Sequence, residues 1–290
     1  MGMPTDIAII DTSLNLPLAE TKIANTGWGS LLKDEESKGY ERHPARHLYA
    51  EVPTVDRGEN PAEDLMREMD RFGIERALLN LTAGDEVAAK AITTHPDRLM
   101  GCWSLDPNRG VEATRDLTRA YETLGVKAAH FFPCGGPAQV PINDKKAFVI
   151  YAKCVELDIP IFVQAGVPGP RVPMDAQYVG LVDEVCWFFP DLRFVFRHGC
   201  EPWTELAVKL MVKWPNLYFS TSAFAPKYYP KDIIDYANTR GADKVIYAGY
   251  YPHGLTLDRI FSEMPAVGFK DHVWPKFLRE NAARVLKLDV

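Results

Sequence analysis

The sequence lacks the patterns of several large classes of protein. Lys and Arg number 33 against 39 Asp and Glu, which gives a net charge of -6 with His neutral. No general positive field is therefore available to attract a phosphate polymer, and we expect no nucleic-acid partner. No apolar run approaches the length of a membrane span. The N-terminal residues also lack the basic and apolar regions of a secretion signal, so we expect a cytoplasmic protein without membrane contact.

The sequence also lacks the short motifs of common cofactor sites. Its five cysteines are widely spaced, without a CxxC pair or a Cys/His cluster of zinc-finger spacing, which is typical of reduced thiols. No glycine fingerprint follows the first predicted strand, and the other glycine clusters lack the Lys-Ser/Thr of a phosphate-binding loop. No GxSxG elbow indicates a nucleophilic serine. We therefore expect no cofactor.

What is present is the composition of a folded chain: of 290 residues, 47% are hydrophobic and 25% are charged. Short β-branched runs alternate with segments of helical spacing. Asn60 is a candidate N-cap for a helix that begins at Pro61 and ends at Gly73, and a second helix over 111–124 is closed by Gly125. The predicted strands cover residues 7–11, 76–81, 99–104, 126–132, 159–164, 193–198, 217–220 and 245–249.

Eight strands with intervening helices predict an α/β fold, a single (β/α)8 TIM barrel over residues 1–290. An open doubly wound sheet is the alternative, because both folds bury parallel strands that consist of continuous apolar runs. Residues 12–60 interrupt the alternation of strands and helices, and this segment is too long for an ordinary connection. We interpret this insertion after the first strand as a lid or a subunit contact, with an unstructured insertion as the alternative.

In a TIM barrel the catalytic groups lie at the C-terminal ends of the strands, so polar residues there are the first candidates for a site. The candidates, in strand order, are Asp11, Ser13, Asn15, His130, Gln164, His198, Ser222, Tyr250 and Tyr251. They can converge only if the strands close into a barrel.

Seven segments carry a resemblance to a known family. They are THPDRLMGCWSLDP (94–107), LGVKAAHFFP (124–133), DIPIFVQAGVPG (158–169), FPDLRFVFRHGCEPW (189–203), WPNLYFSTS (214–222), VIYAGYYP (245–252) and NAARVLKL (281–288). In this order they resemble the amidohydrolase-related TIM barrels, in the branch that includes aminocarboxymuconate-semialdehyde and γ-resorcylate decarboxylases. The resemblance runs nearly from end to end and implies the barrel fold.

The resemblance also implies a metal site, and this sequence departs from the family at the ligands of that site. Typical members bind one divalent metal through a His-x-His on strand one, a His on strand five and an Asp on strand eight. The matching positions hold Ser13 and Asn15, Gln164, and Tyr250. Amide and hydroxyl oxygens without a carboxylate or imidazole hold a catalytic transition metal poorly, so we expect no metal.

The resemblance assigns His198 to the position of a histidine that acts as general base on the attacking water. A histidine can do this without a metal, although a buried structural histidine is the alternative. Tyr250 stands at the former metal position, where a phenol could donate to a developing oxyanion or simply pack. Asn15 and Gln164 could offer amide donors there or satisfy one another, and Ser222 and Tyr251 are further substrate-binding candidates.

The other histidines and Arg197 receive weaker predictions. His130 could bind a substrate carboxylate together with Arg197. However, Arg197 directly precedes His198, so strand alternation predicts that Arg197 points away from the barrel axis. We expect His43 in a solvated loop, and His253 is a weak candidate because it is close to the site in sequence.

The combined interpretation is a metal-independent hydrolase of a small organic acid, lactone, ester or β-keto compound, with His198 as general base and Tyr250 as oxyanion partner or proton donor. The alternative is a decarboxylase or carbon-carbon lyase that acts on an aromatic or unsaturated carboxylate, because both reactions need an anion to be stabilised. A non-catalytic barrel that binds a small molecule is the alternative from another class. The expected partner is a small-molecule substrate, and a homo-oligomer remains open.

Overall fold

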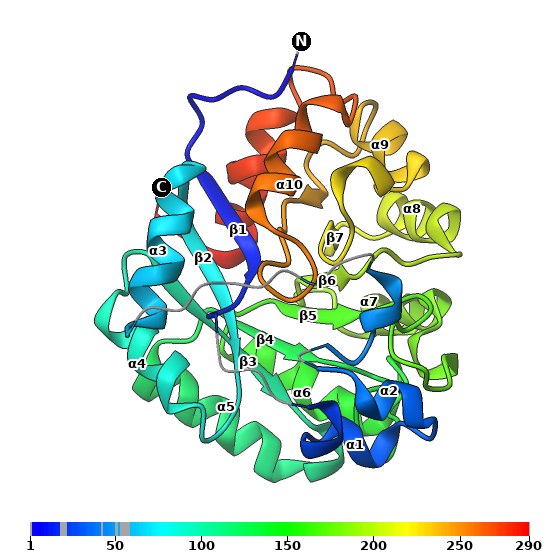
Figure 1. The fold of residues 1–290 in the computed structure, drawn as a ribbon. Coiled ribbons are helices and arrows are strands. Elements are labelled where there is room, and N and C mark those ends of the chain that lie inside the picture. Colours follow the sequence, from blue (N-terminus) through cyan, green and yellow to red (C-terminus); the bar gives the residue numbers. More distant parts are fainter. Residues whose placement is uncertain (1, 18–21, 42, 50–51, 53–58, 290) are drawn as a thin grey trace.

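The computed structural model describes residues 2–17, 22–41, 43–49, 52 and 59–289. In this part of the chain, one sheet holds eight parallel strands in the order of the sequence. Figure 1 labels β1 to β7 of this sheet. The strands are β1 (Ile9–Leu14), β2 (Ile74–Leu81), β3 (Leu99–Leu105), β4 (Ala128–Phe131), β5 (Ile161–Gln164), β6 (Phe194–Arg197), β7 (Leu217–Ser220) and β8 (Val245–Ile246).

Hydrogen bonds between β1 and the segment after β8 bring the first and last strands together. Leu14 forms a parallel bridge with Tyr251. The Tyr250 N–H donates to the Ser13 carbonyl at 2.8 Å, and the Asn15 N–H donates to the Tyr251 carbonyl at 2.9 Å. The sheet is thus a nearly closed (β/α)8 TIM barrel, which confirms the predicted fold and rules out the open doubly wound sheet.

Strand β8 is shorter than the predicted 245–249 because its last residues bond to side chains and to an irregular part of β1. The Gly249 N–H donates to the Asp11 carboxylate at 2.9 Å instead of to a strand carbonyl. The Thr12 N–H reaches the Tyr247 carbonyl at 3.3 Å. A regular ladder therefore stops at Ile246, while the polar residues that follow remain fixed at the barrel end.

Helices cover the outside of the barrel (Figure 1). They are α3 (Pro61–Arg71), α4 (Glu86–Thr94), α5 (Val111–Leu124), α6 (Lys145–Glu156), α7 (Val182–Phe188), α8 (Thr204–Lys213), α9 (Lys231–Ala237), α10 (Leu257–Glu263) and α11 (Asn281–Leu286). The 3-10 turns between them are η3 (Pro107–Arg109), η4 (Asp175–Gln177), η5 (Val179–Leu181), η6 (Pro226–Tyr228) and η7 (Met264–Ala266), and a π-helical turn, η8 (Lys276–Glu280), precedes α11. Among the described residues, no helix is both long and apolar enough to span a membrane.

The helix boundaries follow local sequence signals. The Asn60 side chain accepts the Ala62 N–H at 3.2 Å, which caps α3 with Pro61 at its start. Helix α5 ends at Gly125, whose φ of 65° is the left-handed conformation that glycine adopts without a Cβ penalty. Both helices confirm the predicted boundaries.

The described part of residues 12–60 contains short helical elements rather than long ones. They are η1 (Ile23–Asn25), α1 (Trp28–Leu31), α2 (Glu35–Gly39) and η2 (Arg46–Leu48). The predicted lid also includes residues 18–21, 42, 50–51 and 53–58, which lie outside the described residues. Arg171, in the loop after β5, forms ion pairs with Asp34 at 2.7 Å and Glu36 at 2.9 Å, so the short helices are attached to the barrel through charged side chains.

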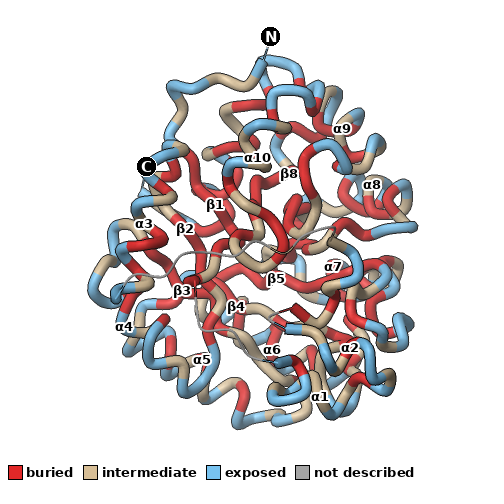
Figure 2. The backbone as a smooth tube through the Cα atoms, in the orientation of Figure 1, coloured by how far each residue is buried: buried red, intermediate tan, exposed pale blue. Residues whose placement is uncertain are grey.

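The buried core has two layers, and Figure 2 shows the buried tube running along the strands with exposed residues on the outer helices. The outer layer lies between the strands and the helices. Side chains of alternate strand residues fill the inside of the barrel, and they are Ile10, Leu78, Met100, Cys102, Ala128, Phe162, Val195 and Ile246. Residues of α11 pack against this inner layer near the start of the strands. The opposite end, where the strands finish, is the place left for a binding site.

Candidate active site

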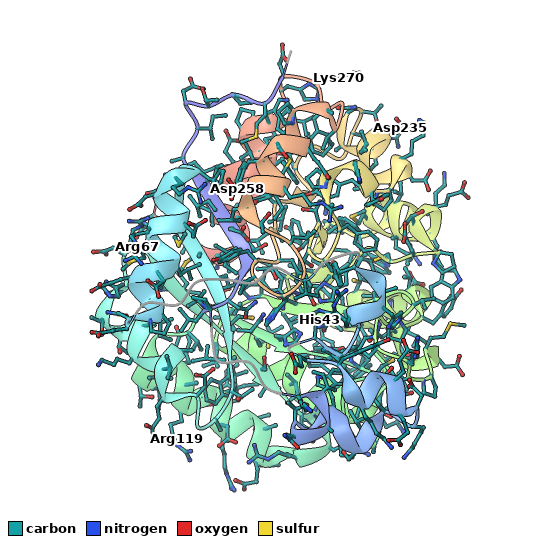
Figure 3. The ribbon with its side chains drawn as sticks, viewed as in Figure 1. His43, Arg67, Arg119, Asp235, Asp258 and Lys270 are labelled. Atoms are coloured by element: carbon teal, nitrogen blue, oxygen red, sulfur yellow. The ribbon has the colours of Figure 1, made fainter. Side chains whose placement is uncertain are left out.

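A cavity of about 920 Å³ opens at the C-terminal ends of the strands, where a TIM barrel places its chemistry. The polar residues that line its barrel side are Asn80, His130, Gln164, Arg197, His198 and Tyr250. The segment between β1 and α3 contributes Ile23, Thr26, Trp28, His43, Ala45 and Tyr49 to the same lining. In Figure 3 His43 lies near the middle of the molecule, whereas Arg119 and Asp235 lie at its edge. The cavity is therefore bounded by the strand ends and by the segment after β1.

Arg197 and His198 both reach this cavity although they are adjacent in sequence. Val195 belongs to the inner layer of the barrel, and strand alternation carries Arg197 to the same side. His198 has a φ of 64°, which ends the strand with a left-handed turn and directs its side chain to the cavity as well. The prediction that Arg197 points away was wrong, because it assumed that His198 continues the strand.

Arg197 is a buried cation with neutral hydrogen-bond partners. Its side chain is 1% exposed. Nη1 donates to the Asn80 Oδ1 at 2.9 Å and Nη2 donates to the Ser13 Oγ at 2.7 Å, while Nε–H has no acceptor. Among the described residues, no carboxylate forms an ion pair with it. The buried carboxyl of Asp11 acts on Arg197 through its charge, without a hydrogen bond between the two side chains.

Asn80 was not predicted as a site residue. It follows Leu78 by two positions on β2, and Leu78 belongs to the inner layer of the barrel. Strand alternation could therefore have placed Asn80 inside the barrel near the end of its strand. An asparagine in a run of leucines gave a weak signal because amides also occur on solvated strand faces.

One hydroxyl group holds the His198 ring, and the other ring nitrogen stays free on the side of the cavity. Its Nδ1 lies 2.9 Å from the Ser222 Oγ, and its backbone N–H donates to the same oxygen at 3.3 Å. The described residues offer no partner for Nε2. Burial, followed by the charge of Arg197, holds the pKa of His198 well below its usual value of 6.5. The imidazole is therefore neutral at physiological pH and is able to accept a proton.

Tyr250 is oriented by His43, a residue of the segment after β1. The Ala45 N–H donates to the His43 Nδ1 at 3.0 Å, so the ring proton must be on Nε2. That Nε2–H donates to the Tyr250 hydroxyl oxygen at 2.9 Å. Burial lowers the pKa of His43 to about 3, which keeps the ring neutral. The Tyr250 hydroxyl hydrogen is then free to donate into the cavity, and burial raises the pKa of Tyr250 to about 12.

The expectation of a solvated loop for His43 was wrong. Its side chain is 5% exposed, and its ring packs edge to face against Tyr250 and Tyr49. His253 also lines the cavity, with its ring 6.2 Å from that of His43 between centroids. Burial lowers the pKa of His253 to about 4. Sequence periodicity could not indicate His43, because the segment that carries it has no regular structure to position it.

His130 fixes the direction of Gln164. Its Nε2 lies 2.7 Å from the Gln164 Oε1 and its Nδ1 lies 3.0 Å from the Ser104 Oγ. Because the amide oxygen only accepts, the His130 Nε2 must be the donor, and Ser104 donates to Nδ1. Burial and the charge of Arg197 lower the pKa of His130 to about 3. His130 thus uses both nitrogens within the protein, and the Gln164 amide NH₂ is left for the cavity.

The remaining predicted residues lie around the cavity without lining it. Ser13 accepts from Arg197, and Ser222 bonds to His198, so both act through a neighbour. Asn15 does not line the cavity, and its Nδ2 is buried without a partner. Tyr251 is 4% exposed and packs in the outer core, because the left-handed φ of 63° at Tyr250 breaks the strand alternation there.

The residues at the implied metal site do not fit a divalent cation. Of the residues at the four matching positions, Ser13 already accepts from the Arg197 guanidinium, and Gln164 Oε1 already accepts from His130. A positive guanidinium next to neutral oxygens opposes the binding of a second cation. Within the described ranges, no group of three His, Cys, Asp or Glu side chains is arranged to hold a metal ion.

A nearly closed parallel barrel with polar groups converging at the C-terminal ends of its strands defines the class of this protein as a TIM barrel. The chain belongs to the amidohydrolase family, whose sequence profile matches residues 10–288. No curated protein matches the sequence.

Solved structures share the fold at low sequence identity. The uncharacterized TIM-barrel protein Bb4693 of Bordetella bronchiseptica is 22% identical with a TM-score of 0.71, and the match covers 96% of this chain and 98% of that one. The 5-carboxyvanillate decarboxylase of Novosphingobium aromaticivorans, complexed with manganese, is 17% identical with a TM-score of 0.66, covering 98% and 97%. The 4-oxalomesaconate hydratase of Rhodopseudomonas palustris is 18% identical with a TM-score of 0.60, covering 96% and 95%. Of these three neighbours, two have a named activity, one as a decarboxylase and one as a hydratase.

Proposed function

We propose that this protein is a metal-independent hydrolase of a small ester, lactone or β-keto compound. The observation that carries the proposal is the pairing of a neutral histidine with a phenol donor at one cavity. The ring centroids of His198 and Tyr250 are 5.0 Å apart in an edge-to-face arrangement. His198 offers a free Nε2, and Tyr250 offers a free hydroxyl hydrogen. A base and an oxyanion donor this close suit attack by water on one carbonyl group.

The reaction requires only groups of this chain and water. With its Nδ1–H donated to Ser222, His198 takes a proton from water on Nε2 while the water oxygen bonds to the substrate carbonyl carbon. The carbonyl electron pair moves to its oxygen, which accepts hydrogen bonds from the Tyr250 hydroxyl and the Gln164 amide. The tetrahedral intermediate then collapses, the bond to the leaving group breaks, and His198 returns the proton to the leaving atom.

The alternative is decarboxylation of an aromatic or unsaturated carboxylate, which the names of several structural neighbours favour. That reaction produces a carbanion or enolate that must receive a proton. The neutral His198 ring carries its one proton on Nδ1, so its free Nε2 has no proton to deliver to a carbanion, and decarboxylation is the second choice. Hydrolysis uses the neutral form directly.

The test is a screen of lactones, thioesters, β-keto acids and hydroxybenzoates with chelator-treated protein in ¹⁸O-labelled water. We expect ¹⁸O in the product carboxylate, no labelled CO₂ from carboxyl-¹³C substrates, and no gain on addition of Mn²⁺ or Zn²⁺. Release of ¹³CO₂ would establish the decarboxylase instead. Activity that disappears with the metal would overturn metal independence, and binding without turnover would indicate a non-catalytic barrel.

Substitutions of His198 and Tyr250 test the roles of the base and of the oxyanion donor separately. We expect His198→Ala to lower kcat by about 10²- to 10⁴-fold, the range for a placed general base. Tyr250→Phe should lower kcat by about 10²- to 10³-fold, the range for one oxyanion donor. Unchanged turnover in both variants would rule out the proposed mechanism.

A further inference from the structure

Helices α6 and α7 carry exposed apolar side chains on the outside of the barrel. Trp187 and Phe188 at the end of α7 are 67% and 56% exposed, and Val149 on α6 is 41% exposed. The Phe188 ring contacts the ring of Phe148 on α6, with 5.4 Å between centroids, so the two helices form one continuous surface, the α6–α7 surface. Adjacent exposed aromatic side chains are typical of the buried centre of an interface rather than of a free face.

The outer face of α6 has an apolar centre and a charge of opposite sign at each end. Its exposed residues recur at helical spacing, and they include Lys145, Val149, Ala152 and Glu156. Lys145 is the first residue of the helix, and it forms no ion pair with any described residue. Glu156 is the last residue, and one of its carboxylate oxygens accepts from Lys153 at 2.6 Å. The two charges lie at equal distances from the middle of the helix.

This order of charges makes the face complementary to a second copy of itself. A two-fold interface uses the same surface on both subunits, so the surface must match itself when it is turned around. A cation at one end and an anion at the other meet this requirement, whereas a strongly acidic or basic partner would match a face of one sign.

We propose that the α6–α7 surface binds a second copy of this chain, with the two α6 helices packed antiparallel about a two-fold axis. When the axis passes the middle of α6, Lys145 faces Glu156 of the partner subunit, and by symmetry this pair forms twice. Val149 then faces Ala152 of the partner subunit, where a small side chain lets the helices approach closely. The same axis places α7 against α7, so the exposed aromatic rings of both copies are buried together.

This dimer is independent of the proposed hydrolysis. None of the residues that form the α6–α7 surface lines the cavity. Association can therefore be measured on the full chain without a substrate, and its outcome does not bear on the catalytic proposal.

Sedimentation velocity over a range of protein concentrations tests the dimer. We expect the wild type to form a species of twice the 32.6 kDa monomer mass. Trp187→Ser should raise the dissociation constant by at least about tenfold, because a buried tryptophan commonly supplies much of the binding energy of an interface. Val87→Ser is the matched control, since Val87 is 48% exposed on α4, outside the α6–α7 surface. It should leave the dissociation constant unchanged.

Charge reversals test the antiparallel register. Lys145→Glu should weaken the dimer by at least about tenfold, because like charges then meet at both ends of the helix pair, and Glu156→Lys should do the same. The double variant exchanges the two charges and should return the dissociation constant to within about threefold of the wild type. Lys231→Glu is the control, because Lys231 is exposed on α9, which follows β7, whereas α6 follows β4.

Three results overturn the inference. The first is a wild-type chain that stays monomeric at about 100 µM, which would leave the surface to a partner of another kind. The second is a dimer that Trp187→Ser does not weaken, because it forms through another face. The third is a dimer that the double charge variant does not restore although each single variant weakens it. Far-UV circular dichroism of every variant separates loss of association from loss of the fold.

Discussion

The Nε2 atom of His43 lies 2.9 Å from the hydroxyl oxygen of Tyr250, and this hydrogen bond joins the segment after β1 to the end of β8. The backbone N–H of Ala45 occupies the other ring nitrogen, so the direction of the bond is fixed from His43 to Tyr250. A residue outside the barrel strands thus determines where the Tyr250 hydroxyl hydrogen points. The described part of this segment completes the site as well as covering it.

The first prediction concerns His43 as a positioning residue. His43→Ala should lower kcat by about tenfold to 100-fold with little change in KM. The Tyr250 hydroxyl loses its fixed orientation in this variant but can still donate a hydrogen bond to the substrate. In the Tyr250→Phe background the same change should have almost no further effect, since residues that act together are not additive. Steady-state kinetics of the double-mutant cycle measure this.

His47→Ala is the control for His43, because His47 is exposed on the same segment and does not line the cavity. It should retain kcat. Fully additive losses for His43→Ala and Tyr250→Phe would show that His43 acts through the fold instead of through Tyr250.

The second prediction concerns the pH dependence of turnover. Burial and Arg197 hold the pKa of His198 below 6.5, so the base form persists as the pH falls below that value. Burial raises the pKa of Tyr250 to about 12, so the donor survives into alkaline solution. We expect kcat/KM to stay flat from neutral pH to about pH 10 and to fall only on the acid side, below pH 6.5. An acid limb centred above 6.5 would contradict the assignment of His198.

The third prediction concerns the ion pairs that attach the segment after β1. Arg171 pairs with Asp34 and Glu36, and all three side chains are partly or largely exposed. Exposed ion pairs contribute little and weaken in salt, so Arg171→Ala should raise KM by no more than about fivefold at low ionic strength. The difference from wild type should vanish in concentrated NaCl.

Arg115→Ala provides the control for Arg171, because Arg115 forms an exposed ion pair with Glu112 on α5 and does not line the cavity. It should leave KM unchanged at every salt concentration. A salt-independent loss in Arg171→Ala would instead indicate packing as the reason for its effect.

The fourth prediction concerns stability in acid. Burial lowers the pKa values of His43 and His130 to about 3 and of His253 to about 4, and His198 shifts in the same direction. The unfolded chain therefore binds more protons than the native protein below pH 6.5, and stability falls as the pH falls. Asp11 opposes this between about pH 4 and 6, because burial raises its pKa to about 6 and the native state holds its proton.

These four histidines and Asp11 together contribute an uptake of up to about three protons on unfolding near pH 5. Urea unfolding between pH 7 and pH 5 measures this uptake as the slope of the free energy of unfolding against pH. His130→Asn should lower the uptake by about one proton. A free energy of unfolding that does not change across this range would contradict the burial of neutral histidines.

The sequence by itself determined the barrel and much of its mouth. Alternating apolar strands and capped helices are local patterns, so the eight strands and the ends of α3 and α5 could be predicted from neighbouring residues. The ends of parallel strands meet on one edge, which is why the convergence of His130, Gln164, His198 and Tyr250 could be predicted from the strand pattern alone.

Only the tertiary structure decided how the mouth is completed. Left-handed φ values at His198 and Tyr250 interrupt strand alternation, so the directions of His198 and Tyr251 could not be read from a period of two. His43 comes from a segment without periodicity, and its partner Tyr250 is 207 residues away in sequence. Contacts between such distant positions depend on how the whole chain closes, and no local pattern specifies them.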